Sequence, residues 1–121
     1  MTEENYSQHK RNGERLANQM SLIELVSQMR NSSKAIERLN IKQYNWWNEG
    51  LHGVARAGIA TVFPQAICMA ASFDKDAVKK CADIISTEAR AKFNESQKNK
   101  DYSIYKGLTL WSPNINIFRD P

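Results

Sequence analysis

The stretch Ile41-Lys-Gln-Tyr-Asn-Trp-Trp-Asn-Glu-Gly-Leu-His-Gly53 is the part of this sequence that most directs the interpretation of its fold. We place a strand over residues 41–47, and glycines at positions 50, 53 and 58 then predict a loop. Side chains alternate along a strand, so the adjacent rings of Trp46 and Trp47 point to opposite sides. One ring can therefore enter a core while the other faces a cleft.

The same stretch holds two indole rings, a carboxylate and an imidazole within ten residues. Glu49 lies two residues after Trp47 and would share its face of an extended chain. An apolar ring beside a carboxylate suits a ligand with hydroxyls and C–H faces, which describes a pyranose sugar. Paired tryptophans are more often core residues, and a single histidine such as His52 is more often structural. The cluster by itself leaves both interpretations open.

A helix and a second strand are predicted further along the chain. Asp74 is suited to cap a helix N-terminus, and apolar residues then recur at spacings of three and four up to Phe93. We expect a helix over residues 74–94 with one buried face, and a polar loop over residues 97–106. Residues 108–112 form the second strand, which ends at Pro113. The order is β-α-β, without an internal repeat.

The region before residue 41 is predicted to be helical and partly frayed. Residues 1–13 are polar and form a segment separate from the main region, residues 14–121. A helical pattern begins at Glu14, and Ser21 with Glu24 three residues later has the spacing of a capping box. A short amphipathic turn or helix follows over residues 32–39. One apolar helical face is expected after the capping box, made of Leu22, Leu25, Val26 and Met29.

Two further motifs place the chain beside a known family. Residues 60–67 read Ala-Thr-Val-Phe-Pro-Gln-Ala-Ile, and residues 108–121 read Leu-Thr-Leu-Trp-Ser-Pro-Asn-Ile-Asn-Ile-Phe-Arg-Asp-Pro. With the Trp-Trp-Asn-Glu segment, they make residues 16–121 resemble the N-terminal part of glycoside hydrolase family 3, the β-glucosidase and β-xylosidase family. The resemblance implies an α/β fold, the N-terminal portion of a (β/α)8 TIM-like barrel. The barrel would be incomplete here, because a whole one takes about 250 residues.

The resemblance implies that Glu49 and Arg119 bind substrate, and the cluster described above adds Trp47 and His52 as candidate substrate-binding residues. The run from Asn48 to Gly53 is similar to the Asn-Glu-Ala-Leu-His-Gly of β-xylosidase-like members. A glutamate there would crowd an exocyclic hydroxymethyl group, which favours a pentose and so β-xylosidase over the alternative, β-glucosidase. Arg119 matches an arginine that binds hydroxyls of the terminal sugar. A structural ion pair with Asp120 is the other interpretation of Arg119.

Members of the family are retaining glycosidases, which need two carboxylates about 5 to 5.5 Å apart. The resemblance places the nucleophile and the acid/base beyond Pro121, so no catalytic residue is assigned within this chain. We expect a truncated piece of a hydrolase that acts on terminal non-reducing sugars of plant polysaccharide oligomers or on aryl glycosides. The piece alone would be inactive. The alternative of another class is a non-catalytic sugar-binding remnant.

Composition is that of an ordinary globular protein, with 41% hydrophobic and 25% charged residues. The net charge is +4, but Glu95 and Asp101 interrupt the most basic stretch, so no nucleic-acid partner is expected. No long apolar run or signal-peptide core is present, which predicts no membrane partner and a cytoplasmic location if Met1 is the true start. Cys68 and Cys81 lack further ligands at metal-binding spacing, and neither a metal nor a cofactor is implied.

Overall fold

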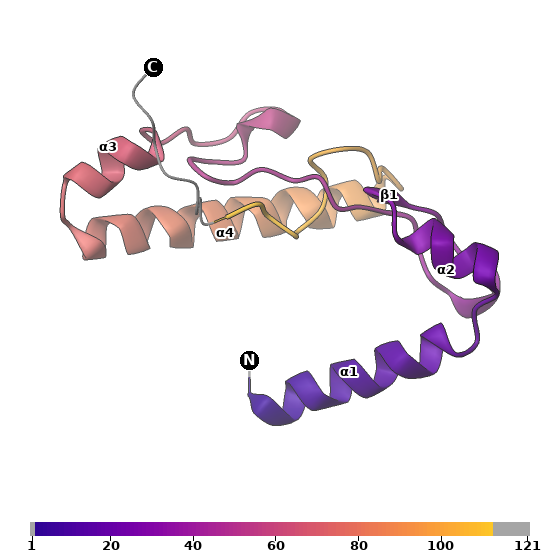
Figure 1. The fold of residues 1–121 in the computed structure, drawn as a ribbon. Coiled ribbons are helices and arrows are strands. Elements are labelled where there is room, and N and C mark those ends of the chain that lie inside the picture. The colour runs from indigo at the N-terminus through magenta and orange to yellow at the C-terminus, as the bar shows by residue number, and fades with distance from the viewer. Residues whose placement is uncertain (1, 113–121) are drawn as a thin grey trace, which may run out of the picture. The chain divides into compact units, whose positions relative to one another are not determined.

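The computed structural model describes residues 2–112, which comprise helices and short strands (Figure 1). The chain divides into two compact units, residues 1–43 and 44–121. The elements of the first are α1 (Glu3–Ala17), α2 (Leu22–Gln28), β1 (Ser32–Ser33) and the 3-10 helix η1 (Glu37–Leu39). Those of the second are β2 (Tyr44–Asn45), η2 (Ala55–Ala57), α3 (Ala66–Ala71) and α4 (Lys75–Lys98). None of the helices within residues 2–112 has the length and apolar character needed to cross a membrane.

Helix α1 begins eleven residues before the position that the hydrophobic pattern predicted. The expectation that residues 1–13 are frayed is wrong, because α1 starts at Glu3. The Thr2 hydroxyl caps the helix by accepting a hydrogen bond from the Asn5 N–H at 3.3 Å. Acidic side chains in the first turn are attracted to the positive end of the helix dipole, which stabilises the helix. These local polar contacts form a helix that has no buried residue.

Helix α2 confirms the predicted capping box. The Ser21 hydroxyl accepts from the Glu24 N–H at 3.3 Å, and the Glu24 carboxylate accepts from the Ser21 N–H at 2.8 Å. Arg38, on η1, donates from Nε to the same carboxylate at 3.0 Å. This hydrogen bond and the ion pair with Arg38 lower the pKa of Glu24 from 4.5 to about 2. The apolar face predicted for this helix remains exposed at Leu22, Leu25, Val26 and Met29.

Helix α4 also starts where the sequence predicted. The Asp74 carboxylate accepts from the Ala77 N–H at 2.9 Å, which caps the first turn. Before this cap, residues 72–74 turn the chain out of α3 (Figure 1), and Phe73 takes a left-handed φ of 53°. The helix runs to Lys98, four residues past the predicted end, and the Lys98 ammonium pairs with Glu95 at 3.2 Å. The predicted loop therefore starts later than residue 97.

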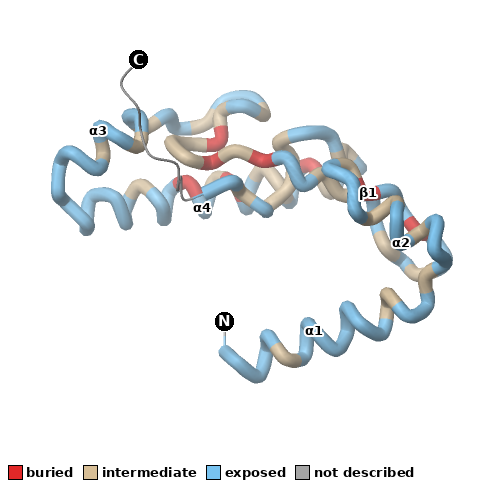
Figure 2. The backbone as a smooth tube through the Cα atoms, in the orientation of Figure 1, coloured by how far each residue is buried: buried red, intermediate tan, exposed pale blue. Residues whose placement is uncertain are grey.

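The core of the second unit lies between α4 and the loops around it (Figure 2). Ile85 and Ala89 of α4 and Val54 of the loop are each 7% exposed. Ala60, Phe63, Leu108 and Leu110 pack against these three residues. Packing against α4 therefore determines where the segments on either side of it lie.

The two predicted strands of this unit are much shorter than expected. Regular strand is confined to β2, and Asn48 pairs with Leu110 through one parallel bridge. The parallel direction agrees with a β-α-β order, and the mixed helix and strand content agrees with an α/β class. Parallel strands depend on neighbours at both edges, and within residues 2–112 the bridge between Asn48 and Leu110 is the one β-pairing between these two predicted strands. The expected lengths, residues 41–47 and 108–112, are therefore wrong for this chain.

Candidate functional site

A buried asparagine joins the two segments that carry the sequence motifs. Asn48 is 1% exposed, and its Nδ2 donates to the carbonyls of Asn45 at 2.9 Å and Thr109 at 3.3 Å. Its Oδ1 accepts from the Gly107 N–H at 2.7 Å. The Trp111 N–H donates to the Asn48 carbonyl at 2.9 Å. Every polar atom of this buried amide has a partner, so the residue before Glu49 is held firmly in place.

The Tyr44 hydroxyl makes a second set of hydrogen bonds between the same two segments. It accepts hydrogen bonds from the N–H groups of Leu108 at 2.8 Å and Thr109 at 2.9 Å, and it lies 2.8 Å from Thr109 Oγ1. Sequence reasoning missed both Tyr44 and Asn48. The available signal was an amide directly after an expected strand rich in aromatic residues, but the sequence did not indicate its partners more than fifty residues away.

The tryptophans stack near the surface instead of filling a core. Trp47 lies against Trp111, with ring centroids 4.5 Å apart and planes tilted by 37°. Trp46 meets Tyr44 edge-on at 4.8 Å. Trp46 remains 46% exposed and Trp47 38% exposed, so neither ring follows the core interpretation. Indole Nε1 of Trp111 donates to the Trp46 carbonyl at 3.2 Å, which connects the two motifs again.

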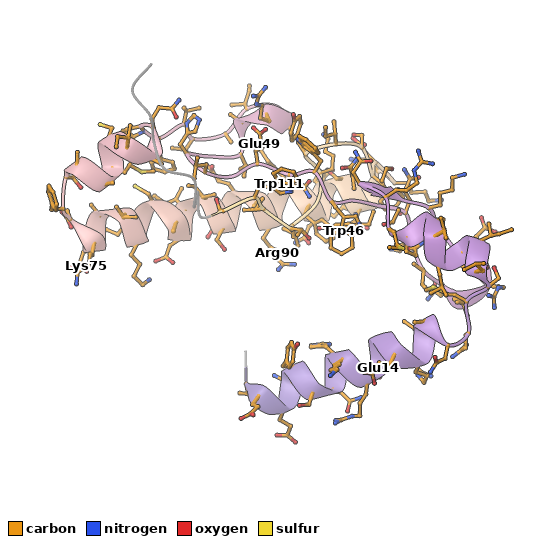
Figure 3. All side chains as sticks on the ribbon, in the orientation of Figure 1. Glu14, Trp46, Glu49, Lys75, Arg90 and Trp111 are labelled. Carbon is orange, nitrogen blue, oxygen red and sulfur yellow. The ribbon has the colours of Figure 1, made fainter. Side chains whose placement is uncertain are left out.

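A cavity of about 480 Å³ lies beside this aromatic pair. Figure 3 labels Glu49 and Trp111, which both line it. The cavity brings together two of the predicted site residues, Glu49 and His52, while Trp47 contacts the lining through Trp111. Arg119, the fourth predicted residue, is outside the described residues. The other lining residues are Leu51, Gly53, Ala55, Arg56, Val62 and Gln65.

Charge in the cavity comes from one carboxylate and one guanidinium. Oε2 of Glu49 pairs with Nε of Arg56 at 3.1 Å, and the two side chains are 41% and 65% exposed. The guanidinium of Arg56 also lies over the Tyr105 ring, 5.8 Å from its centroid. Arg56, Gln65 and Trp111 were missed as site residues by sequence reasoning. Trp111 belongs to a recognised motif, whereas Arg56 carries no signal except its position in a polar loop.

His52 makes hydrogen bonds to the backbone of its own loop and also lines the cavity. Its Nδ1 lies 3.1 Å from the Phe63 carbonyl, and the Phe63 N–H donates to the His52 carbonyl at 2.8 Å. A carbonyl can only accept, so Nδ1 carries the proton of that bond and Nε2 remains for another partner. Both earlier interpretations of His52 are therefore compatible with its position. The described residues contain no group of three or more histidine, cysteine or acidic side chains arranged to hold a metal.

Helix α4 fixes the loop that closes the cavity. The Glu88 carboxylate accepts from the N–H of Thr61 at 3.1 Å and from its hydroxyl at 2.7 Å. Lys92 Nζ donates to the Ala57 carbonyl at 3.0 Å. Gly53 has a φ of 127°, and a Cβ there would lie 2.4 Å from the Thr61 carbonyl oxygen. The loop therefore requires glycine at this position.

Sequence comparison shows that the chain is similar to curated proteins that are named as β-xylosidases. It is 43% identical over 116 residues to probable β-D-xylosidase 7 of Arabidopsis thaliana. It is 44% identical over 108 residues to xylan 1,4-β-xylosidase of Xylanibacter ruminicola, and 41% identical over 116 residues to β-xylosidase/α-L-arabinofuranosidase 2 of Medicago sativa. These similarities confirm the relationship that the motifs predicted.

Each similarity covers 88% of this chain. The chain spans 12–14% of the length of those relatives. No family model matches the sequence, and no solved structure matches it.

Proposed function

We propose that the chain is part of a retaining glycoside hydrolase of family 3 that acts on terminal β-xylosyl residues. The observation that carries this proposal is the 44% identity to a xylan 1,4-β-xylosidase, over 88% of the chain. The fold proposed for the whole protein is a (β/α)8 barrel, to which this chain contributes early strands and the helix α4. The proposed substrates are short xylo-oligosaccharides and aryl xylosides.

The cavity chemistry supports a sugar-binding role for this segment. The Glu49 carboxylate accepts hydrogen bonds from hydroxyls, and the Trp111 ring, backed by Trp47, covers the apolar face of a pyranose. His52 and Gln65 supply further polar groups at the cavity wall. A volume of about 480 Å³ lies within the range for small-molecule sites. We propose Glu49, His52, Trp47 and Arg119 as substrate-binding residues.

Glu49 is proposed as a binding residue and not as the nucleophile. A retaining mechanism needs a second carboxylate about 5 to 5.5 Å from the first, across the scissile bond. Glu49 is the single carboxylate among the described residues that line the cavity, and its partner is the cation Arg56. The catalytic pair is therefore assigned to other parts of the longer protein, and the glutamate side chain selects a pentose by crowding a hydroxymethyl group.

The test uses the protein expressed from its complete reading frame. We expect 4-nitrophenyl β-D-xylopyranoside to give the highest kcat/KM, above the matching glucopyranoside and α-L-arabinofuranoside. Glu49→Gln should raise KM for the xyloside, while Arg90→Gln, an exposed change on α4 away from this cavity, should not. Preference for the glucoside would overturn the pentose assignment. Failure to cleave any of the three substrates would overturn the glycosidase proposal.

A further inference from the structure

Arg56 has a defined position beside Glu49 that no sequence motif assigned to it. It is the middle residue of η2, seven positions after Glu49, and its Nε lies 3.1 Å from Glu49 Oε2. Its guanidinium also lies over the Tyr105 ring at 5.8 Å. Two contacts from different segments therefore hold one cation at the cavity wall, and a planar guanidinium suits this combination better than an ammonium group does.

Tyr105 is itself fixed to the segment that carries Glu49. Its N–H donates to the Trp47 carbonyl at 3.1 Å, and its φ is 66°, a left-handed conformation that is uncommon for an aromatic residue. The ring that supports Arg56 and the carboxylate that pairs with it are thus attached to neighbouring backbone positions. Movement of the Trp47–Glu49 backbone would carry both partners of Arg56 together.

The ion pair is too exposed to matter much for folding. The side chains of Arg56 and Glu49 are 65% and 41% exposed, and pairs of this kind contribute little to stability. Its physical consequence is that it orients the Glu49 carboxylate. Within residues 2–112, Glu49 accepts a hydrogen bond through Oε2 alone, from Arg56, so Oε1 keeps its capacity to accept others.

We infer that Arg56 is a positioning residue for substrate binding: its guanidinium, supported by Tyr105, holds the Glu49 carboxylate so that Oε1 accepts a hydrogen bond from a sugar hydroxyl. This inference rests on the proposed function of the cavity. Arg56 acts through Glu49 and makes no contact with the sugar. Because a hydroxyl bond of this kind is present before and during reaction, its loss raises KM and leaves kcat nearly unchanged.

The first test compares Arg56 variants in the protein expressed from its complete reading frame. Arg56→Gln is expected to raise KM for 4-nitrophenyl β-D-xylopyranoside about tenfold with kcat within about threefold. Arg56→Lys should recover part of this loss, because it keeps the charge and loses the planar fork. Arg90→Gln is the matched control and should leave KM and kcat unchanged. The melting temperature should stay within about 2 °C for all three, as expected for exposed positions.

Tyr105 provides a second variant that leaves the ion pair chemically intact. Tyr105→Phe keeps the ring under the guanidinium and should preserve KM, whereas Tyr105→Leu removes the π face and should raise KM in the same direction as Arg56→Gln. A rise in KM for the leucine variant alone supports the inference. Equal KM values for the wild type and the leucine variant would overturn the role of the ring.

A double-mutant cycle separates positioning from direct sugar binding. If Arg56 acts through Glu49, adding Arg56→Gln to Glu49→Gln changes KM by less than about twofold, because the interaction is already lost. Multiplicative effects of the two changes would show that Arg56 binds the sugar itself, which overturns the inference. A wild-type protein that cleaves xyloside while Arg56→Gln keeps a normal KM overturns the inference alone. A wild-type protein that cleaves no glycoside overturns the proposed function as well.

Discussion

Gly107 is the residue whose lack of a side chain most constrains the site. A Cβ at this position would lie 2.6 Å from Asn48 Nδ2, 2.7 Å from the Tyr44 hydroxyl oxygen and 2.8 Å from the Asn45 carbonyl. Gly107→Ala must therefore separate the polar groups that join the two motif segments, at a cost of about 1–3 kcal/mol. Hydrogen exchange of residues 105–110, measured by mass spectrometry in the complete protein, should accelerate.

The control for this change is another glycine in open space. Gly13 lies inside α1, and a Cβ there meets no atom within 4 Å. Gly13→Ala should stabilise the helix by about 0.5–1 kcal/mol and leave exchange of residues 105–110 unchanged. Unaltered exchange in Gly107→Ala would mean that the cluster around Asn48 does not hold these segments together.

Substitution of Asn48 gives a second test of whether these polar contacts hold the two motif segments together. Asn48→Ala leaves the Gly107 N–H and two carbonyls without their amide partner, and each unsatisfied buried group costs about 1–3 kcal/mol. Near-ultraviolet circular dichroism of the Trp47–Trp111 pair should weaken, because these rings lie on the two segments that separate. Asn94→Ala, at an exposed position on α4, is the control and should preserve the signal.

At the scale of elements, α2 gives the clearest dependence on pH. Hydrogen bonds from Arg38 and Ser21 lower the pKa of Glu24 from 4.5 to about 2. The folded state favours the ionised form of Glu24. The contribution of this group to folding stability is therefore complete above pH 4.5 and is lost as the pH falls towards 2. The Ser21 amide resonance should titrate with this low midpoint. Arg38→Gln should raise the midpoint, and an identical midpoint in both proteins would remove Arg38 as the cause.

Elements whose determinants are local were predicted well. Ser21 with Glu24 and Asp74 with Ala77 are cap contacts over three residues, so the sequence alone indicated where α2 and α4 begin. The start of α1 was missed because the helical pattern was recognised only from Glu14, whereas the helix begins at the polar Thr2 cap. The strands were placed in the right segments but made too long, since strand length depends on partners that are distant in sequence.

The same distinction between local and distant determinants applies to the candidate site. The sequence indicated Glu49 and His52, which share a short motif, and the structure places both at one cavity. It did not indicate Arg56 as the partner of Glu49, or Asn48 as the partner of Gly107, because side-chain partners depend on loop geometry. A short sequence motif therefore indicates candidate site residues more readily than it indicates the side chains that contact them.

At the scale of the whole molecule, the described residues bury little apolar surface. Only Ile36, Val54, Ile85 and Ala89 are buried hydrophobic residues within residues 2–112. A second cavity, of about 560 Å³, exposes a mainly apolar face of α3 and α4 that includes Met69 and Val78. Burial of apolar area is the main source of stability, so the 121-residue chain by itself should be weakly cooperative.

This property predicts how the isolated chain behaves on heating. Helical circular dichroism should persist at 20 °C and decline over a broad range, and the apolar face should bind 8-anilinonaphthalene-1-sulfonate, as loosely packed states do. Val78→Asp places a charge on that face and should reduce dye binding without loss of helix signal, whereas Lys79→Asp, on the next exposed position of α4, should reduce it less. A sharp unfolding transition without dye binding would show that these few buried residues suffice for a cooperative fold, because loosely packed helices bind the dye and melt gradually.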